Sequence, residues 1–327
     1  MNKIKSVTKP LMWFTALALA TVAAGCGSGD PILGGGAGGT VSAGPVGVVT
    51  TANILGTAAP FGIAATAGVT NTSTAPITHI EGDVVLDPVA GAQCNAVAVD
   101  NAGGFGLCGS AVLPSAFAPT LGGTSKVYSG LYDPLSIVST VVADLKAGFL
   151  KITPPAGPPA AGSLGGATNL PAGTTLGAVS GSAMVQGDNL FFPGVYQSLT
   201  SIMVTGDLTL DAQGNPNAVF VFQSSSTVGT AAGGPTPASR TRILLINGAK
   251  ASNVWWQAGT SATLGLYSEF QGNILASESI TMETGATSCG RLLAGAFAAG
   301  QFTFDSNVVS VPGQPFAPPA TYSTVCQ

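Results

Sequence analysis

A strand-like phrase recurs three times in the last third of the chain, and a threonine occupies the same place in each copy. These threonines, Thr263, Thr281 and Thr303, lie roughly 20 residues apart, with glycines between the copies. A period of this length, in short β-like runs, is typical of a solenoid in which each coil stacks on the next. The chain is therefore expected to form stacked β coils that repeat whatever side chain points outward.

Within these copies apolar and polar residues alternate, which predicts strands with one face in the core. The expected inward residues are Ala262, Leu264, Ile280, Met282, Phe302 and Phe304, and the expected outward residues are Ser261, Thr263, Ser279, Thr281, Gln301 and Thr303. By the same pattern Thr209 points outward between Leu208 and Leu210. Because stacked strands lie about 4.8 Å apart, the outward threonines should form a row at that spacing.

Four other runs are apolar on both alternating sides: 219–222, 243–246, 254–256 and 292–294. A strand buried on both faces needs cover outside as well as a core inside. Asp133-Pro134 is a helix start signal, and apolar residues then follow at helical spacing up to Phe149. We predict a helix over 134–150 that covers these four runs along one face of the solenoid.

Charged residues make up only 7% of the chain and hydrophobic residues 46%. The net charge is −4 and the basic residues are scattered, which excludes nucleic acid as a partner.

His79 is the sole histidine, in a strand-like context, and we assign it a structural role. No GxSxG, no CxxC and no cluster of acidic and basic residues occurs, so we expect no catalytic site, metal or cofactor. A solenoid carbohydrate enzyme is the enzymatic alternative.

The N-terminus has the pattern of an export signal. Lys3, Lys5 and Lys9 precede an apolar stretch that is too short to span a bilayer, and Ala23-Ala-Gly-Cys26 follows. This resembles a bacterial lipoprotein signal over 1–25, with Cys26 lipidated and 26–47 as a Gly-rich tether. We expect an outer-membrane lipoprotein or cell-surface protein, held to the membrane through Cys26. The alternative is an ordinary cleaved signal and a secreted protein.

Four cysteines remain for disulfides, which are expected in an exported chain: Cys94, Cys108, Cys289 and Cys326. Three pairings are possible. Proximity along the sequence favours Cys94–Cys108 and Cys289–Cys326, and the second pair would tie the tail at 313–327 to the last coils.

Several segments together carry a family resemblance, in order, over roughly 50–312. They are Asn53-Ile-Leu55, Phe61-Gly-Ile-Ala64, Val69-Thr-Asn-Thr72, Gly82-Asp-Val84, Pro193-Gly-Val-Tyr196, Thr205-Gly-Asp-Leu-Thr-Leu-Asp-Ala-Gln-Gly214, Asn217-Ala-Val-Phe-Val-Phe-Gln223, Leu245-Ile-Asn-Gly-Ala249, Asn253-Val-Trp-Trp-Gln257, Gly272-Asn-Ile-Leu-Ala276 and Gly290-Arg-Leu-Leu-Ala294. The chain thus resembles the DUF3494 ice-binding protein family. The resemblance implies an all-β domain over 48–312 with one long helix, an irregular right-handed three-sided β-solenoid with the helix packed along one face. It also implies that N-terminal strands pack beside the C-terminal coils.

Family members bind ice through a flat exposed face, which in some members carries a Thr-Ala/Gly-X-Thr/Asn motif. Thr284-Gly-Ala-Thr287 fits this motif, whereas Leu266-Tyr-Ser-Glu269 and Asp305-Ser-Asn-Val308 depart from it in the neighbouring coils. The candidate ice-binding residues are Thr263, Thr281, Thr303, Ser261, Ser279, Thr209, Thr284 and Thr287. The expected function is therefore that of a monomer that adsorbs to an ice crystal and inhibits its growth or recrystallisation. The alternative is a cell-surface adhesion or matrix module without ice affinity.

Overall fold

The computed structural model describes residues 54–72, 75–87, 97–98, 105–106, 119–129, 137–152, 167–178, 183–314 and 326. All of these belong to the compact unit Pro31–Gln327. The predictions for the export signal, Cys26, the tether, Asp133-Pro134, Cys94 and Cys108 lie outside the described residues.

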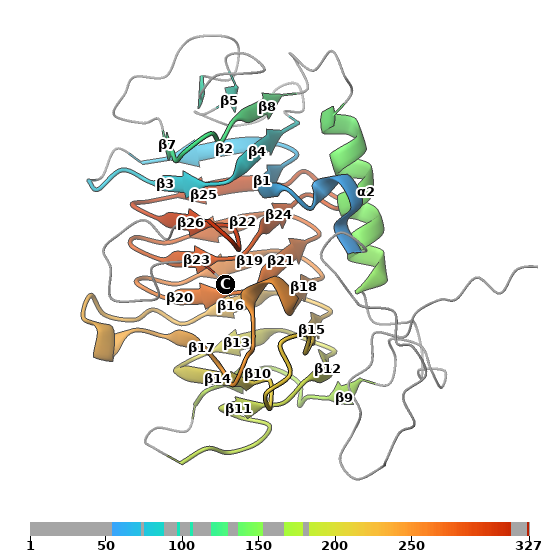
Figure 1. The fold of residues 1–327 in the computed structure, drawn as a ribbon, viewed down its shortest axis with the longest axis vertical. Coiled ribbons are helices and arrows are strands. Elements are labelled where there is room, and N and C mark those ends of the chain that lie inside the picture. Colours follow the sequence, from blue (N-terminus) through green and yellow to red (C-terminus); the bar gives the residue numbers. More distant parts are fainter. Residues whose placement is uncertain are drawn as a thin grey trace, which may run out of the picture. The chain divides into compact units, whose positions relative to one another are not determined.

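The described residues form three parallel sheets, which we call sheets A, B and C (Figure 1). Sheet A contains, in spatial order, β8 (Val127–Ser129), β4 (Asp83–Leu86), β1 (Phe61–Ala65), β24 (Leu292–Ala294), β21 (Asn273–Ala276), β18 (Val254–Ala258), β15 (Phe220–Ser224), β12 (Gly194–Ser198) and β9 (Thr168–Asn169). Sheet B contains β10 (Thr174–Leu176), β13 (Ile202–Val204), β16 (Val228–Thr230), β19 (Ala262–Leu264), β22 (Ile280–Met282), β25 (Gln301–Phe304) and β2 (Gly68–Asn71). Sheet C contains β11 (Leu190–Phe191), β14 (Asp207–Asp211), β17 (Arg242–Ile246), β20 (Glu269–Gln271), β23 (Thr287–Cys289), β26 (Val308–Ser310), β3 (His79–Glu81) and β7 (Thr120–Leu121).

From β1 to β3 and from β9 to β26, successive strands visit sheets A, B and C in turn, so each of these coils contributes one strand to each sheet. This arrangement confirms the prediction of a three-sided β-solenoid. A separate antiparallel pair is formed by β5 (Val97–Ala98) and β6 (Phe105–Gly106). Three short 3₁₀ helices, η1 (Gly56–Ala58), η2 (Pro237–Ser239) and η3 (Ala251–Asn253), complete the described elements together with helix α2 (Ile137–Lys151).

The core lies between the three sheets and is built from the inward residues of each coil. The alternation predicted for β19, β22 and β25 is confirmed, because their apolar residues are buried. In sheet A, the rings of Tyr196, Phe222 and Trp256 stack in successive coils, with centroids 5.3 Å and 4.2 Å apart. Register pairing holds these rings in line, since Tyr196 pairs with Phe222 and Phe222 with Trp256.

Helix α2 covers the outer side of sheet A, as Figure 1 shows. Its buried residues, Val138, Val141, Leu145 and Phe149, pack with outward residues of sheet A such as Trp255 and Leu293. The predicted cover is therefore confirmed for the runs at 219–222, 254–256 and 292–294. It is wrong for 243–246, because this run is β17 in sheet C, where Ile246 is exposed.

The N-terminal strands complete one end of the stack. β1 pairs with β24, β2 with β25 and β3 with β26, all in parallel. This pairing confirms what the family resemblance implied. Arg291 reinforces the junction, because its Nε donates to the carbonyl oxygen of Ala59 at 2.5 Å and its Nη1 to Asn273 Oδ1 at 3.2 Å.

A disulfide joins Cys289 on β23 to Cys326, with an S–S distance of 2.07 Å, as the sequence proximity predicted. Both half-cystines pack with Ala251 and Leu245, beside sheet C. Among the described residues, no helix combines the length and apolar character that a membrane crossing requires.

Candidate functional site

A continuous row of outward positions runs along sheet B. Hydrogen-bonded register places Thr263 beside Thr281, Thr281 beside Thr303 and Thr303 beside Thr70. We call these four residues the threonine row. Thr263 is exposed and the other three are half-buried, while the residues on either side of each threonine in its strand point into the core, apart from Asn71. The three predicted threonines are thus brought into one line, and Thr70 extends it.

The hydroxyls of Thr263, Thr281 and Thr303 make no hydrogen bond to any described residue, whereas most neighbouring hydroxyls do. Thr70 accepts a hydrogen bond from Gln301 Nε2 at 2.8 Å, so its own hydroxyl hydrogen stays available. A hydroxyl that the protein leaves unpaired at the surface is available to bind water. The row therefore presents hydroxyls to solvent in a regular line.

A second outward row, beside the first, is used to hold neighbouring coils together. Ser261 Oγ accepts the backbone N–H of Ser279 at 3.3 Å, and Ser279 Oγ accepts that of Gln301 at 3.1 Å. Ser261 also donates to Glu278 Oε2 at 3.3 Å. Ser261 and Ser279 lie next to the threonine row as predicted, but their oxygens already bind protein groups. They support the row more than they add free hydroxyls to it.

The Thr284-Gly-Ala-Thr287 motif does not form an exposed surface. Thr284 lies in the turn between sheets B and C and donates to Asp305 Oδ2. Thr287 belongs to β23 in sheet C and is only 6% exposed. The motif therefore supplies no flat pair of free hydroxyls, and its second threonine faces away from sheet B.

Thr209 points away from the core between Leu208 and Leu210, as predicted, but it is buried and so cannot be one of the exposed ice-binding residues. Thr209 lies on β14 in sheet C and is 2% exposed, between its register partners Leu190 and Leu244. Alternation in the sequence predicts on which side of β14 Thr209 lies, but it does not predict whether that side is exposed or buried. Thr209 is therefore separate from the threonine row.

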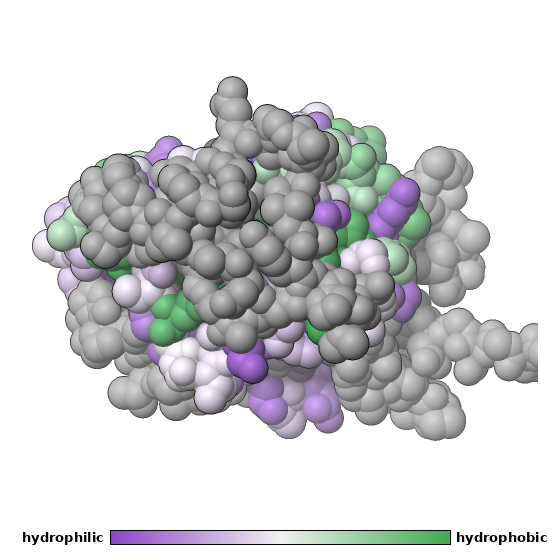
Figure 2. All heavy atoms as spheres, turned by 90° about the horizontal axis from the view of Figure 1, so that it is seen from above, coloured by the Kyte–Doolittle hydropathy of each residue, from purple (hydrophilic) through white to green (hydrophobic). Residues whose placement is uncertain are grey.

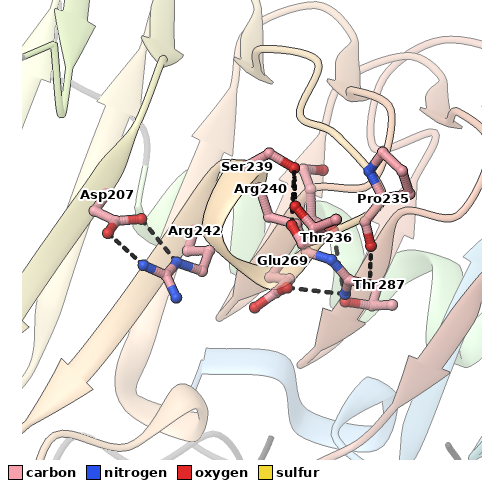
Figure 3. Close-up of polar contacts among 9 residues, drawn as sticks. Asp207, Pro235, Thr236, Ser239, Arg240, Arg242, Glu269 and Thr287 are labelled. Carbon is pink, nitrogen blue, oxygen red and sulfur yellow. Dashed lines mark hydrogen bonds and ion pairs between the residues drawn. The ribbon is translucent and has the colours of Figure 1, made fainter. Parts of the chain in front are cut away.

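The outer side of sheet C carries ion pairs in place of a neutral hydroxyl row (Figure 3). Arg242 binds Asp207 through two hydrogen bonds of 2.8 Å and 2.5 Å. Arg240, which is half-buried, donates to Glu269 Oε1 at 2.9 Å, and Glu269 is buried. Burial raises the pKa of Glu269 to about 7, even though the charge of Arg240 acts in the opposite direction. The partly exposed charges of Asp207 and Arg242 hydrate strongly, so this side is a poor template for ordered water.

His79 is paired at the end of sheet C, in agreement with a structural role. Its Nε2 lies 2.9 Å from Glu81 Oε1 and its Nδ1 2.8 Å from Thr120 Oγ1. Within the described part of the chain, no group of three or more His, Cys, Asp or Glu residues is placed to hold a metal ion.

Toward the end of sheet B at β10, the line of outward positions no longer consists of threonines only. Beyond Thr263 the register partners are Gly229, then Met203, then Thr175. Hydroxyls are therefore continuous only in the four coils that contain the threonine row.

Seen from the end of the stack where β7 and β8 lie, the coloured surface mixes hydrophilic and hydrophobic residues over small areas (Figure 2).

Comparison with known proteins places this fold in a family. A family model described as ice-binding-like matches residues 63–310, from β1 to the end of β26. That range covers well over half of the chain. The chain belongs to the ice-binding-like family.

Two relatives and one crystal structure show how close this ice-binding-like protein is to others of its family. An ice-binding protein from a Nostoc species is 50% identical over 119 residues, which are 36% of this chain and 40% of that protein. The alignment thus spans less than half the length of that relative. An ice-binding protein from Flammulina populicola is 28% identical over 74% of this chain and 82% of its own. The crystal structure of an ice-binding protein from Antarctomyces psychrotrophicus superposes with a TM-score of 0.55, at 30% identity, over 80% of this chain and 98% of the other.

Proposed function

We propose that this protein binds ice through the outward face of sheet B and thereby inhibits ice growth or recrystallisation. The observation that carries the proposal is the threonine row, Thr263, Thr281, Thr303 and Thr70, in which three hydroxyls have no partner among the described residues. The family relatives named above, which are ice-binding proteins, support the same conclusion.

Ice offers a binder only water molecules in a repeating lattice, so recognition requires a rigid surface that orders water in a matching way. Parallel register holds the threonines about 4.8 Å apart. Each threonine has a hydroxyl that anchors a water and a methyl group beside it, and its branched side chain restricts χ1. Bridging waters contribute nearly as much as direct hydrogen bonds. Many weak, regularly spaced contacts can therefore act together.

Sheet B is the side of the solenoid best suited to this role. Helix α2 covers the outer side of sheet A, and ion pairs occupy sheet C. Carboxylates near the threonine row are held at its edge: Asp305 accepts hydrogen bonds from Thr72, at 2.5 Å, and from Thr284. Glu283 Oε2 accepts the backbone N–H of Leu266 at 3.0 Å.

The central test replaces Thr281, whose neighbours in the row are Thr263 and Thr303. A Thr281→Tyr variant should lose most of its ability to arrest ice recrystallisation, because the bulky ring breaks the level surface in the middle of the row. Grain growth in a frozen sucrose film, followed by microscopy at micromolar protein, measures the effect.

Two variants serve as controls for the same substitution. Thr284→Tyr changes the turn between sheets B and C, and Thr140→Tyr changes an exposed position on α2. Both should retain activity. Loss of activity in the Thr284 variant with retention in the Thr281 variant would move the site to the turn. A wild-type protein that leaves grain growth unchanged, yet binds cells or polysaccharide above freezing, would favour the adhesion module.

We further propose that the activity is non-enzymatic and that the protein works outside the cytoplasm as a monomer. The lipoprotein-like segment before Cys26 supports an outer-membrane or cell-surface location, with simple secretion as the alternative. Metabolic labelling with a fatty acid analogue, compared between the natural chain and Cys26→Ser, decides between the two.

A further inference from the structure

A row of buried amide side chains lies on the outer side of sheet A, where helix α2 ends. Register places Asn169 beside Gln197, Gln197 beside Gln223 and Gln223 beside Gln257. The next position in the same row is Leu275, which packs beneath α2. This row thus changes from an apolar to an amide residue within one coil.

The three glutamines are buried, at 8%, 0% and 1% exposed for Gln197, Gln223 and Gln257. The Oε1 atom of each is shielded from solvent and accepts no hydrogen bond from any described residue. Buried amide oxygens nearly always accept at least one hydrogen bond, because leaving one unpaired is costly. Three such atoms in consecutive coils call for a common explanation.

Exchanging the amide oxygen and nitrogen does not remove the problem at Gln223, the central member of the row. Gln223 Nε2 donates to the carbonyl oxygen of Ile152, just beyond the end of α2, at 3.0 Å, and exchanging its oxygen and nitrogen would set two acceptors against each other. Gln197 Nε2 donates to Asn169 Oδ1 at 2.5 Å. Each of these two nitrogens carries a second N–H, and neither reaches the Oε1 atom of a neighbouring glutamine within hydrogen-bond distance.

We propose that this amide row is a binding site for buried water, with one molecule seated between each pair of neighbouring Oε1 atoms. Side chains in register follow the backbone spacing of about 4.8 Å. A water that donates to two oxygens at that separation, each about 2.8 Å away, subtends an angle of about 118°, close to its own tetrahedral geometry. Polar surroundings with several partners are the condition under which buried water is stable.

Bridging waters would satisfy all three oxygens, since Gln223 shares one molecule with Gln197 and another with Gln257. They would also allow sheet A to stay covered beyond the last turn of α2 without an apolar side chain. This inference does not depend on ice binding, so the two proposals can fail separately.

The test uses Gln257→Met, because the Gln257 side chain makes no hydrogen bond to a described residue and its replacement breaks none. Long-lived internal waters are counted in the purified protein from the magnetic relaxation dispersion of water ¹⁷O. Gln257→Met should lose the water shared with Gln223, and Gln223→Met should lose both. Leu275→Met, the adjacent position in the row, is the matched control and should leave the signal unchanged.

An unchanged dispersion amplitude in both glutamine variants would overturn the proposal. So would a rise in melting temperature for Gln257→Met, which is the result expected if the wild-type oxygen were unpaired. A high-resolution crystal structure of the wild-type protein gives an independent answer that needs no variant to fold. Water density within hydrogen-bond distance of the three Oε1 atoms supports the site, and protein N–H donors in that place exclude it.

Discussion

Hydroxyl groups of the same chemical type have different roles in this molecule because of where their hydrogen bonds go. Thr281 on β22 and Ser279 just before it are two residues apart, yet the Thr281 hydroxyl has no partner among the described residues and Ser279 accepts the N–H of Gln301. Thr284 is engaged with Asp305. Alternation predicts Thr281 and Ser279 as outward hydroxyls, and the family motif predicts Thr284 as a third. Only their hydrogen bonds show which of them is available to ordered water.

Glu269 gives a prediction at the scale of one residue. Burial raises its pKa to about 7, above the ordinary value of 4.5, so the folded protein holds this proton more tightly than the unfolded chain does between these pH values. The contribution of Glu269 to stability therefore falls as pH rises from about 4.5 to about 7. On the scale of pKa shifts, the loss is on the order of 1–3 kcal/mol.

In Glu269→Gln this part of the pH dependence should disappear. Chemical denaturation between pH 4 and pH 8 measures it, as the difference between the two proteins' free energies of unfolding. Glu278→Gln, at an exposed corner, controls for the simple loss of a charge. Curves for wild type and Glu269→Gln that stay parallel across this range would contradict the assignment.

Among the elements, the turns between sheets B and C explain why the predicted motif is structural. Tyr267, Gly285 and Ser306 occupy the same corner position in successive coils, with φ values of 50°, 70° and 55°. This left-handed conformation favours glycine, which is found in only one of the three coils. The glycine of Thr284-Gly-Ala-Thr287 is thus explained by the geometry of the corner, without an ice-binding role.

Helix α2 allows a prediction at the scale of the element. Leu145 is 0% exposed and packs on sheet A, whereas Leu150 is 57% exposed on the same helix. Leu145→Ala should lower the free energy of unfolding by about 2–5 kcal/mol, because a buried leucine leaves a cavity. Leu150→Ala should change it by less than about 0.5 kcal/mol. Equal effects in urea denaturation would show that α2 does not cover the sheet as described.

For the whole molecule, the decisive feature is that the two ends of the described chain meet in one surface. Thr70 and Thr303 are register partners on β2 and β25, although most of the chain separates them in sequence. Removing the N-terminal coil would leave β24, β25 and β26 with open edges and would shorten the threonine row. The same N-terminal strands therefore both close one end of the stack and extend the proposed ice-binding face.

The prediction at this scale concerns Thr70. Because it continues the row, Thr70→Tyr should reduce inhibition of ice recrystallisation as strongly as Thr303→Tyr does. Thr175→Tyr, in the same line but beyond Met203 and Gly229, should have a clearly smaller effect. If Thr70→Tyr kept full activity while Thr303→Tyr lost it, the N-terminal strand would lie outside the functional surface.

The sequence by itself determined the local features of this protein. The period of about 20 residues predicts stacked coils. Alternation within each strand predicts the inward and outward sides of β19, β22 and β25, and the helical spacing predicts α2 to within a few residues at its C-terminal end. These features depend on neighbours along the chain, so residue order is sufficient to reveal them.

Tertiary structure decided which sheet each strand joined and what covered it. Thr209 and Thr287 look like Thr281 in local pattern, yet both are buried in sheet C. β17 has the apolar pattern of a strand under the helix but lies on another side of the solenoid. Thr70 joins the row only because β2 pairs with β25. Burial and register across the stack arise from contacts between distant residues, and local periodicity carries no information about them.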